Sequence, residues 1–231
     1  MVAASYRGGR GEFFATPRRL GGPSWFREPM RDDCLMTTAR LEAFSDAVIA
    51  IVITIMVLEL RIPHDASLEA LKPLVPVFLS YILSFVTLGI YWNNHHHMFV
   101  VVERVEGKIL WANLHLLLWL SLFPFVTGWM GETDFDVVPV AAYGMVALVA
   151  AIAYYVLQTA IIWDQGVGSK LAAAVGRNLK GKASPVLYVA GILSAYVNRW
   201  VALGCYVVVA LMWLVPDRRI EKFDEESMSA R

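Results

Sequence analysis

Charged side chains are scarce in this sequence: Asp, Glu, Lys and Arg make up 17% of its 231 residues, against about a quarter in an average soluble protein. The 20 basic and 20 acidic residues cancel, which excludes a strongly basic nucleic-acid-binding protein and an acidic disordered chain. Cysteine is limited to Cys34 and Cys205. Two cysteines so far apart form neither a disulfide framework nor a metal-site pattern.

Apolar side chains, by contrast, are abundant. Hydrophobic residues make up 58% of the chain and the mean hydropathy is +0.54, whereas an average soluble protein is about 45–50% apolar. A globule of 25.8 kDa does not bury that much apolar surface. Composition therefore predicts a polytopic membrane protein in contact with a lipid bilayer.

Six segments are apolar and long enough to suggest membrane-spanning helices, which need about 20 residues each. Four are separate, at 40–60, 74–96, 109–130 and 137–163, and the third contains a proline kink at Phe123-Pro124-Phe125. The block 184–216 is interrupted at Asn198, Arg199 and Trp200, which predicts a short helical hairpin. The expected fold is all-α, an integral membrane protein with six transmembrane helices.

The two ends of the chain differ from this core. Residues 1–35 hold five glycines, three prolines and six arginines without apolar periodicity, so we expect a disordered or non-native tail. The helical domain is expected to span 36–220, followed by a second tail at 221–231. Thr37 or Thr38 offers a hydroxyl N-cap for the first helix.

Basic residues indicate the orientation, since Lys and Arg accumulate on the cytoplasmic side. With the N-terminus inside, 17 of the 20 basic residues lie on the inner side, and only Arg61, Lys72 and Arg199 lie outside. This asymmetry predicts cytoplasmic N- and C-termini.

The first predicted helix carries a stripe about 100° wide when its residues are placed at 100° intervals. The stripe comprises Arg40, Phe44, Ala47, Ile51, Thr54, Ile55 and Leu58. Asp46 lies off the stripe, and a carboxylate within a span is costly unless it faces protein or water. We therefore expect Asp46 to contact a neighbouring helix, to act directly in function, or both.

Two motifs carry a family resemblance. Arg40-x-x-x-Phe44-Ser45-Asp46 opens the first span, and Trp92-x-x-His95-His96-x-x-Phe99 ends the second. Together they resemble the transmembrane-protein-175 family of potassium channels, in particular its short prokaryotic members with one six-helix repeat. The resemblance covers about residues 36–220, and Asn113 in the third span is more weakly familial.

The resemblance implies a potassium-selective channel in which four identical chains surround a central pore lined by the first helix. Its matching pore positions are Ile51, Thr54, Ile55 and Leu58, with Ile51 at the narrowest constriction. Arg40, Phe44, Ser45 and Asp46 match a polar network that ties the first helix to the second and third, where Trp92, His95, His96 and Asn113 lie. K⁺ is then the permeant ion, and no cofactor or resident metal is implied.

Several alternatives stay open at the level of sequence. The hydroxyl of Thr54 either faces the permeating ion or bonds a carbonyl one turn back. Adjacent histidines point 100° apart, so a metal site formed by His95, His96 and His97 is disfavoured; a structural role, with hydrogen bonds to Asp46, Ser45 or Arg40, is the main alternative.

Three functions remain as hypotheses. The first is the passive channel, in the inner membrane of a bacterial cell. The second is a proton- or ion-coupled secondary cation transporter, which is disfavoured because no internal repeat is evident and Pro124 is the only proline deep in a span. The third is a non-transporting scaffold or an enzyme that uses the histidines, whereas the first two hypotheses describe a non-enzymatic protein.

Overall fold

The computed structural model describes residues 37–63, 65–100, 102, 105–166, 171 and 179–214. The chain divides into two compact units, Met1–Cys34 and Leu35–Arg231, and every described residue belongs to the second. The predicted tails at 1–35 and 221–231 lie outside the described residues.

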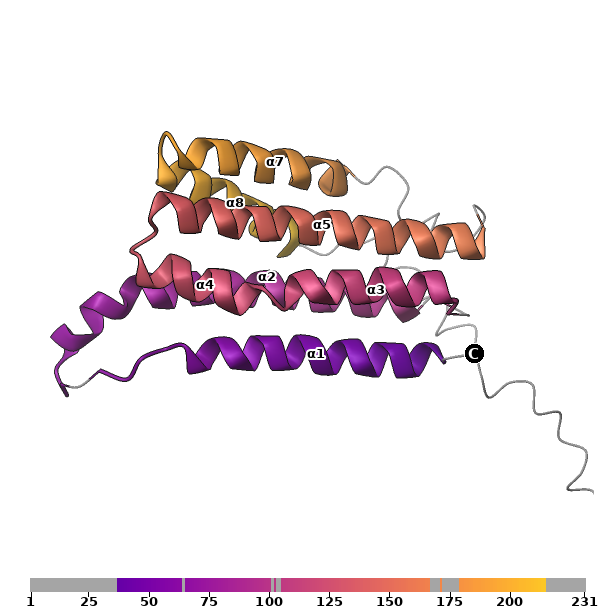
Figure 1. Ribbon diagram of the computed structural model, residues 1–231, viewed down its shortest axis with the longest axis horizontal. Coiled ribbons are helices and arrows are strands. Elements are labelled where there is room, and N and C mark those ends of the chain that lie inside the picture. The colour runs from indigo at the N-terminus through magenta and orange to yellow at the C-terminus, as the bar shows by residue number, and fades with distance from the viewer. Residues whose placement is uncertain are drawn as a thin grey trace, which may run out of the picture. The chain divides into compact units, whose positions relative to one another are not determined.

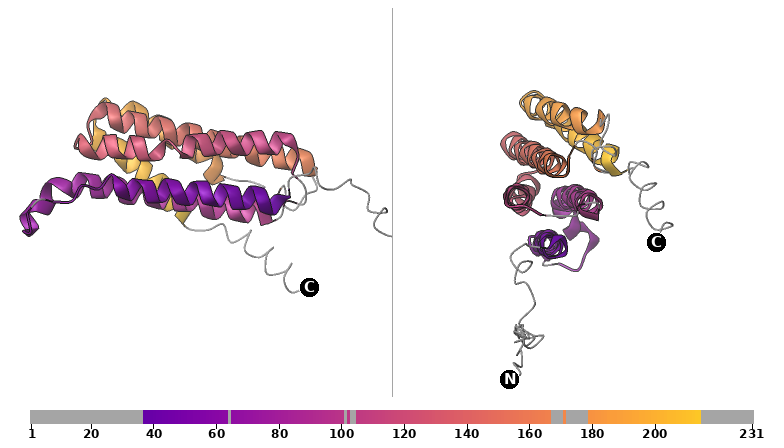
Figure 2. Two further views of the ribbon diagram at one scale, coloured as in Figure 1. Left: turned by 60° about the horizontal axis from the view of Figure 1, so that its bottom comes forward. Right: turned by 90° about the vertical axis from the view of Figure 1, so that its right-hand side faces the viewer.

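The described part of the second unit is helical. Its elements are α1 (Thr38–Leu58), the 3₁₀ helix η2 (Leu68–Leu74), α2 (Val75–Val100), α3 (Gly107–Leu120), α4 (Phe123–Glu132), α5 (Val137–Gln165), α7 (Leu179–Ala195) and α8 (Arg199–Leu214). In Figures 1 and 2 these helices run roughly along one direction, with α1 at one edge and α7 and α8 at the other. The helices α2 to α5 lie between these edges.

The predicted spans are confirmed as helices. Four stretches are long and apolar enough to cross a membrane, namely Thr38–Leu58, Leu68–Val100, Gly107–Glu132 and Val137–Gln165, and Arg199–Leu214 is a shorter apolar helix. The predicted hairpin is also present, because α7 ends at Ala195 and α8 begins at Arg199. The all-helical membrane architecture is therefore confirmed, whereas the orientation of the termini stays a prediction.

The third span is broken at the proline, as predicted. Helix α3 ends at Leu120 and α4 begins at Phe123, with Pro124 in its first turn. Proline has no backbone N–H and is favoured in the first turn of a helix, where that group would lack an intrahelical partner. The span therefore consists of two shorter helices joined at Ser121 and Leu122.

One helix start in the structure has a side-chain cap, and the cap expected at the first helix is absent. The carboxylate of Asp136 accepts a 2.7 Å hydrogen bond from the backbone N–H of Val137 at the start of α5. Thr37 occupies the N-cap position of α1, but its hydroxyl forms no cap bond. The hydroxyl of Thr38 instead donates to the carbonyl of Val102, 3.3 Å away, which ties α1 to the chain after α2.

Candidate functional site

Helix α1 has one face packed against the bundle and one face without a partner in the single chain. The buried face consists of Leu41, Ser45, Ile49, Val52 and Met56. The stripe predicted from sequence lies on the other side: Phe44 is 49% exposed, Ile51 55%, Ile55 41% and Leu58 80%. Arg40, Ala47 and Thr54 are exposed with them.

Thr54 lies at the middle of this exposed face. Its hydroxyl donates a 2.9 Å hydrogen bond to the carbonyl oxygen of Ile51, one turn earlier. The lone pairs of the hydroxyl oxygen stay available, since a hydroxyl both donates and accepts. The carbonyl bond proposed as an alternative is thus present, and it leaves Thr54 with an outward-facing acceptor.

A chain of buried side chains connects α1, α3 and α2. The amide nitrogen of Asn113 on α3 donates to the hydroxyl oxygen of Ser45, 2.8 Å away, and that hydroxyl donates to the carbonyl of Leu41 at 2.9 Å. The amide oxygen of Asn113 lies 2.8 Å from Nε2 of His95. Ser45, His95 and Asn113 are each 0% exposed, so these bonds are shielded from competing water.

The directions of these bonds fix the tautomer of His95. The amide oxygen of Asn113 is an acceptor, so the Nε2 atom of His95 is the donor and carries the proton. Its Nδ1 atom is buried without a hydrogen-bond partner, which costs less for a lone pair than for an orphaned N–H. The imidazole also packs against Phe99, with ring centroids 4.6 Å apart.

Two further side-chain contacts connect α1 and α2. The indole nitrogen of Trp92 donates to the carboxylate of Asp46 at 3.0 Å, and the Nδ1 atom of His96 lies 2.6 Å from the carboxylate of Glu42. Glu42 and Asp46 are one turn apart on α1, as Trp92 and His96 are on α2. The two helices are antiparallel neighbours, so their equal spacing brings both pairs together.

In the structure, the two histidines of the predicted network thus have different partners from those expected. His95 bonds Asn113 and His96 approaches Glu42; neither bonds Ser45, Asp46 or Arg40. Sequence reasoning missed Glu42, although its place four residues before Asp46 matches the spacing of Trp92 and His96.

Arg40 and Phe44 are the other departure from the expected network. Both side chains are exposed, and Arg40 makes no side-chain hydrogen bond or ion pair among the described residues. The reason is geometric: they lie on the stripe of Ile51 and Leu58, which points away from α2 and α3. Among the described residues of a single chain, only Ser45 and Asp46 of the first motif contact the neighbouring helices through side-chain hydrogen bonds.

The opposite end of α1 meets α4. Arg61, just beyond α1, forms a 2.7 Å ion pair with Glu132 at the end of α4, and both side chains are largely exposed. Between the two helices lies a groove of about 740 Å³ whose walls include Ile51, Ile55 and Phe125. The exposed face of α1 therefore continues into a groove against the broken third span.

Within the ranges that the structure describes, no group of three His, Cys, Asp or Glu residues is arranged to hold an ion. His95 and His96 are directed to different helices, towards Asn113 and Glu42.

Comparison with known families and proteins identifies similar chains. Residues 40–124 match the family described as endosomal/lysosomal potassium channel TMEM175. A protein of Chryseobacterium sp. (strain P1-3), named as a potassium channel, is 52% identical over 192 residues, which cover 83% of this chain and 100% of that protein. A protein of Streptomyces collinus, also named as a potassium channel, is 28% identical over 76% of this chain and 91% of its own length.

A solved structure shares the fold. It is the crystal structure of a lysosomal potassium-selective channel TMEM175 homologue from Chamaesiphon minutus, with a TM-score of 0.66 and 28% identity over 76% of this chain and 95% of that chain. A vertebrate relative from Gallus gallus, named endosomal/lysosomal proton channel TMEM175, is 34% identical over 38% of this chain but only 20% of its own length.

Proposed function

The chain belongs to the TMEM175 family of potassium channels, and from this premise we propose that it is a potassium-selective channel in which four copies surround a pore lined by α1. The family is one of channels, not of enzymes. K⁺ passes down its gradient in this proposal, and the ring of Ile51 side chains forms the narrowest constriction.

The observation that carries the proposal is the exposed face of α1. In the single chain it leaves Ile51, Ile55 and Leu58 between 41% and 80% exposed, on a helix whose other face is buried. Arg40 and Thr54 share this exposed face, and a guanidinium or hydroxyl is unfavourable against lipid tails. A face that combines apolar rings with these polar groups fits a pore lining or a contact between copies better than it fits a lipid-facing surface.

A constriction of this kind gates by dewetting. Four isoleucine side chains around an axis leave a narrow apolar passage that expels water, and ions then face a desolvation barrier. Opening widens the passage or turns the side chains away from the axis. Thr54 lies within a turn of Ile51 and supplies one acceptor oxygen from each copy, which compensates part of the lost hydration of a cation.

The polar contacts of α1 support the same arrangement. The bonds from Ser45 to Asn113 and from Asp46 to Trp92 hold the opposite side of the helix against α3 and α2. Because this anchorage is on the side away from Ile51, it fixes the rotation of α1 without occupying the pore-facing side. We assign these side chains a positioning role.

The membrane placement is part of the proposal. We infer that both termini are cytoplasmic, since 17 of the 20 basic residues lie on the inner side in that orientation. The relatives named as potassium channels are bacterial, which supports the inner membrane of a bacterial cell as the location.

The test is ion flux through the purified chain in potassium-loaded liposomes. We expect downhill K⁺ flux that exceeds Na⁺ flux and needs no second gradient. Ile51→Asn places polar groups at the constriction, so the dewetting barrier falls and flux rises several-fold. Ile51→Leu keeps the constriction apolar and is expected to stay within about twofold of the wild type.

Val57→Asn is the matched control, because Val57 is 46% exposed on the same helix but lies about 120° around from Ile51. Equal responses of Val57→Asn and Ile51→Asn would contradict the pore assignment. K⁺ transport that requires a proton or sodium gradient would instead favour the coupled transporter. A proton current without K⁺ flux would indicate that the chain conducts protons, as the names of the vertebrate relatives say of them.

A further inference from the structure

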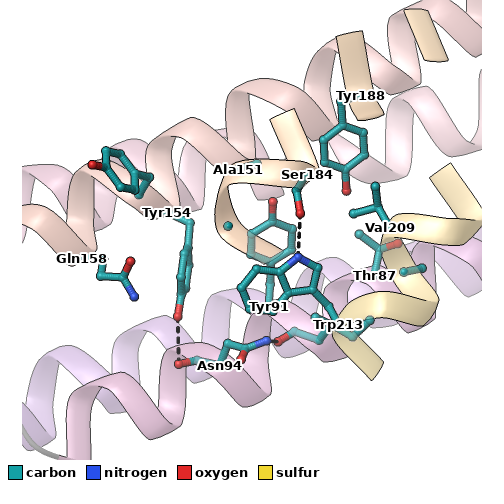
Figure 3. Close-up of a pocket in the computed structure, with 14 residues that line it drawn as sticks. Thr87, Tyr91, Asn94, Ala151, Tyr154, Gln158, Ser184, Tyr188, Val209 and Trp213 are labelled. Atoms are coloured by element: carbon teal, nitrogen blue, oxygen red, sulfur yellow. Dashed lines mark hydrogen bonds between the residues drawn. The ribbon is translucent and has the colours of Figure 1, made fainter. Parts of the chain in front are cut away.

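A cavity lies between α2, α5, α7 and α8, on the side of α2 away from the contacts with α1. Its volume is about 70 Å³. Aromatic and aliphatic walls from Tyr91, Tyr154, Val209 and Trp213 surround it (Figure 3). None of the described residues that line it is charged.

Part of the polar lining is already engaged by the protein. The hydroxyl of Tyr154 donates to the carbonyl of Asn94 at 3.1 Å, and the indole nitrogen of Trp213 donates to the hydroxyl oxygen of Ser184 at 2.7 Å. Figure 3 draws both bonds. The hydroxyl of Thr87 donates to the carbonyl of Leu83 at 2.8 Å. These groups shape the walls and stay in place without a ligand.

Three other polar groups in the lining have no such partner. Within the described ranges, the hydroxyls of Tyr91 and Tyr188 and the carboxamide of Gln158 form no side-chain hydrogen bond. Tyr188 is 5% exposed and Gln158 8%, and what exposure they keep includes the wall of this cavity. Each of the three groups lines the cavity and can donate or accept a hydrogen bond, so an occupant of the cavity can bond them.

We propose that this cavity binds the hydroxyl head of an uncharged single-chain amphiphile. A hydroxyl both donates and accepts, so it satisfies a phenol and a carboxamide together. The aromatic walls favour an alkyl chain, and a carboxylate or ammonium head would lie without a countercharge in a low-dielectric site.

The size and opening of the cavity fit this class of ligand. Its volume of about 70 Å³ is roughly half that of the apolar cavity of about 150 Å³ that binds benzene, which suits a small head rather than a whole lipid. Tyr155 lines the cavity and is 63% exposed. Beside it on α5, Ile152 and Val156 are exposed and apolar, so a chain leaving past Tyr155 continues along a lipid-facing surface.

The site is independent of the proposed pore. Thr87, Tyr91 and Asn94 lie on one side of α2, whereas Trp92 and His96 lie on another side, towards α1. Binding is therefore measurable without any transport assay, and failure of the cavity proposal leaves the channel proposal untouched.

The test uses the full chain in phosphatidylcholine nanodiscs and a photoreactive probe, 1-octanol with a diazirine at its third carbon. Light converts the diazirine to a carbene, which inserts into nearby bonds, and mass spectrometry locates the modified residues. We expect modification concentrated at Tyr91, Tyr155 and Tyr188. Unlabelled octanol should suppress it, whereas octane, which lacks the hydroxyl, should compete at least about fivefold less well because one hydrogen bond is missing.

Two variants separate binding from general lipid contact. Ala151→Leu adds three carbons to the cavity wall and should abolish the focused modification, whereas Ala190→Leu makes the same change at an exposed position of α7 outside the lining and should not. The double change Tyr91→Phe with Tyr188→Phe keeps the shape of the cavity. It should reduce the advantage of octanol over octane even if Ala151→Leu fails to fold.

Three results would overturn the proposal. The first is modification spread evenly over lipid-facing residues. The second is equal competition by octanol and octane. The third is an unchanged pattern in Ala151→Leu, which would mean that the probe never enters the cavity and that the polar groups there bond only water.

Discussion

Helix α1 and the group α5, α7 and α8 are held in the bundle in different ways. Directional side-chain bonds attach α1: Asn113 to Ser45 and Trp92 to Asp46. The other group has the bond from Trp213 to Ser184, but its main feature is close packing around one aromatic ring. Tyr206 of α8 lies against Gly144 of α5 and against Gly191 of α7.

The packing around Tyr206 leaves no spare room. A Cβ added at Gly144 or Gly191 would collide with the ring of Tyr206, so both positions admit only a hydrogen as side chain. The ring is also near Tyr143 and Tyr188, with centroids 5.7 and 6.0 Å away. The Tyr206 hydroxyl donates to the carbonyl of Val140 at 3.2 Å.

The difference has a physical reason. Small residues let helices approach closely in a membrane, where dispersion replaces the hydrophobic effect between helices. Such packing needs contact all around the ring. Helix α1 packs only one face, that of Leu41, Ile49, Val52 and Met56, and adds to it a few bonds of defined direction. The group α5, α7 and α8 is therefore packed around Tyr206, whereas the contacts of α1 combine one packed face with the bonds at Ser45 and Asp46.

The largest expected effect comes from breaking the packed group. Gly144→Ala forces the new methyl into Tyr206, and overpacking of this kind costs about 1–3 kcal/mol or more. The midpoint temperature of unfolding in detergent should fall clearly. Tyr206→Leu in the same chain makes room and should recover part of the loss, as expected for coupled neighbours.

Gly204→Ala on α8 is the control for that experiment. A Cβ at Gly204 meets no atom within 4 Å, and alanine is a better helix former than glycine by about 1 kcal/mol. Stability should stay equal or rise. If Gly144→Ala and Gly204→Ala behaved alike, close packing at Tyr206 would not be what holds α5, α7 and α8 together.

A smaller effect is expected from the attachment of α1. Asn113→Leu removes the donor to Ser45 and the acceptor of His95, both buried. Hydrogen bonds between membrane helices contribute about 0.6 kcal/mol on average, so losing two of them should cost about 1 kcal/mol. Unfolding of Asn113→Leu, Ser45→Ala and their combination forms a double-mutant cycle.

The cycle should be non-additive, because Ser45→Ala removes little once Asn113 is already gone. Additive losses in the combined variant would mean that the two side chains do not act through a shared bond. In that case α1 would be held by packing, as α5, α7 and α8 are, and the contrast between the two regions would disappear.

The smallest effect is expected at the far end of α1. Arg61→Gln breaks the exposed ion pair with Glu132, and exposed pairs contribute about 0–1 kcal/mol. The unfolding midpoint should shift by little, and the wild-type value should change equally little between low and high salt, which screens exposed charges. A loss as large as that of Asn113→Leu would show that this end is fastened as firmly as the buried one.

Much of the fold was predictable because the bilayer imposes long apolar helices. The spans, the break before Pro124 and the turn between α7 and α8 follow from runs of apolar residues and from the few residues that interrupt them. The ends were less predictable: Thr37 has a capping side chain, but its hydroxyl makes no cap bond. Local propensity alone does not reveal that the neighbouring Thr38 contacts Val102.

The contacts of the candidate site were predictable only in part. The periodicity of α1 indicated which side chains share a face, and the exposed stripe agrees with it. Pairing between helices depends on their relative rotation and height, which no single helix encodes. Asn113 was therefore expected in the network without a partner, and Glu42 was missed. The close packing at Tyr206 brings together Gly144, 62 positions earlier, and Gly191, 15 positions earlier, and left no recognisable sequence pattern.

Because the third span is broken, two separate helices, α3 and α4, contact the two ends of the α1 segment. Asn113, on α3, forms a hydrogen bond with Ser45 in the first half of α1. Glu132, on α4, forms an ion pair with Arg61, just beyond the other end of α1. Because α3 and α4 are two helices rather than one continuous helix, a tilt of α4 would move the ion pair at Arg61 and leave the hydrogen bond at Ser45 in place. In the proposed assembly of identical copies around a pore, that motion would widen or narrow one mouth of the pore.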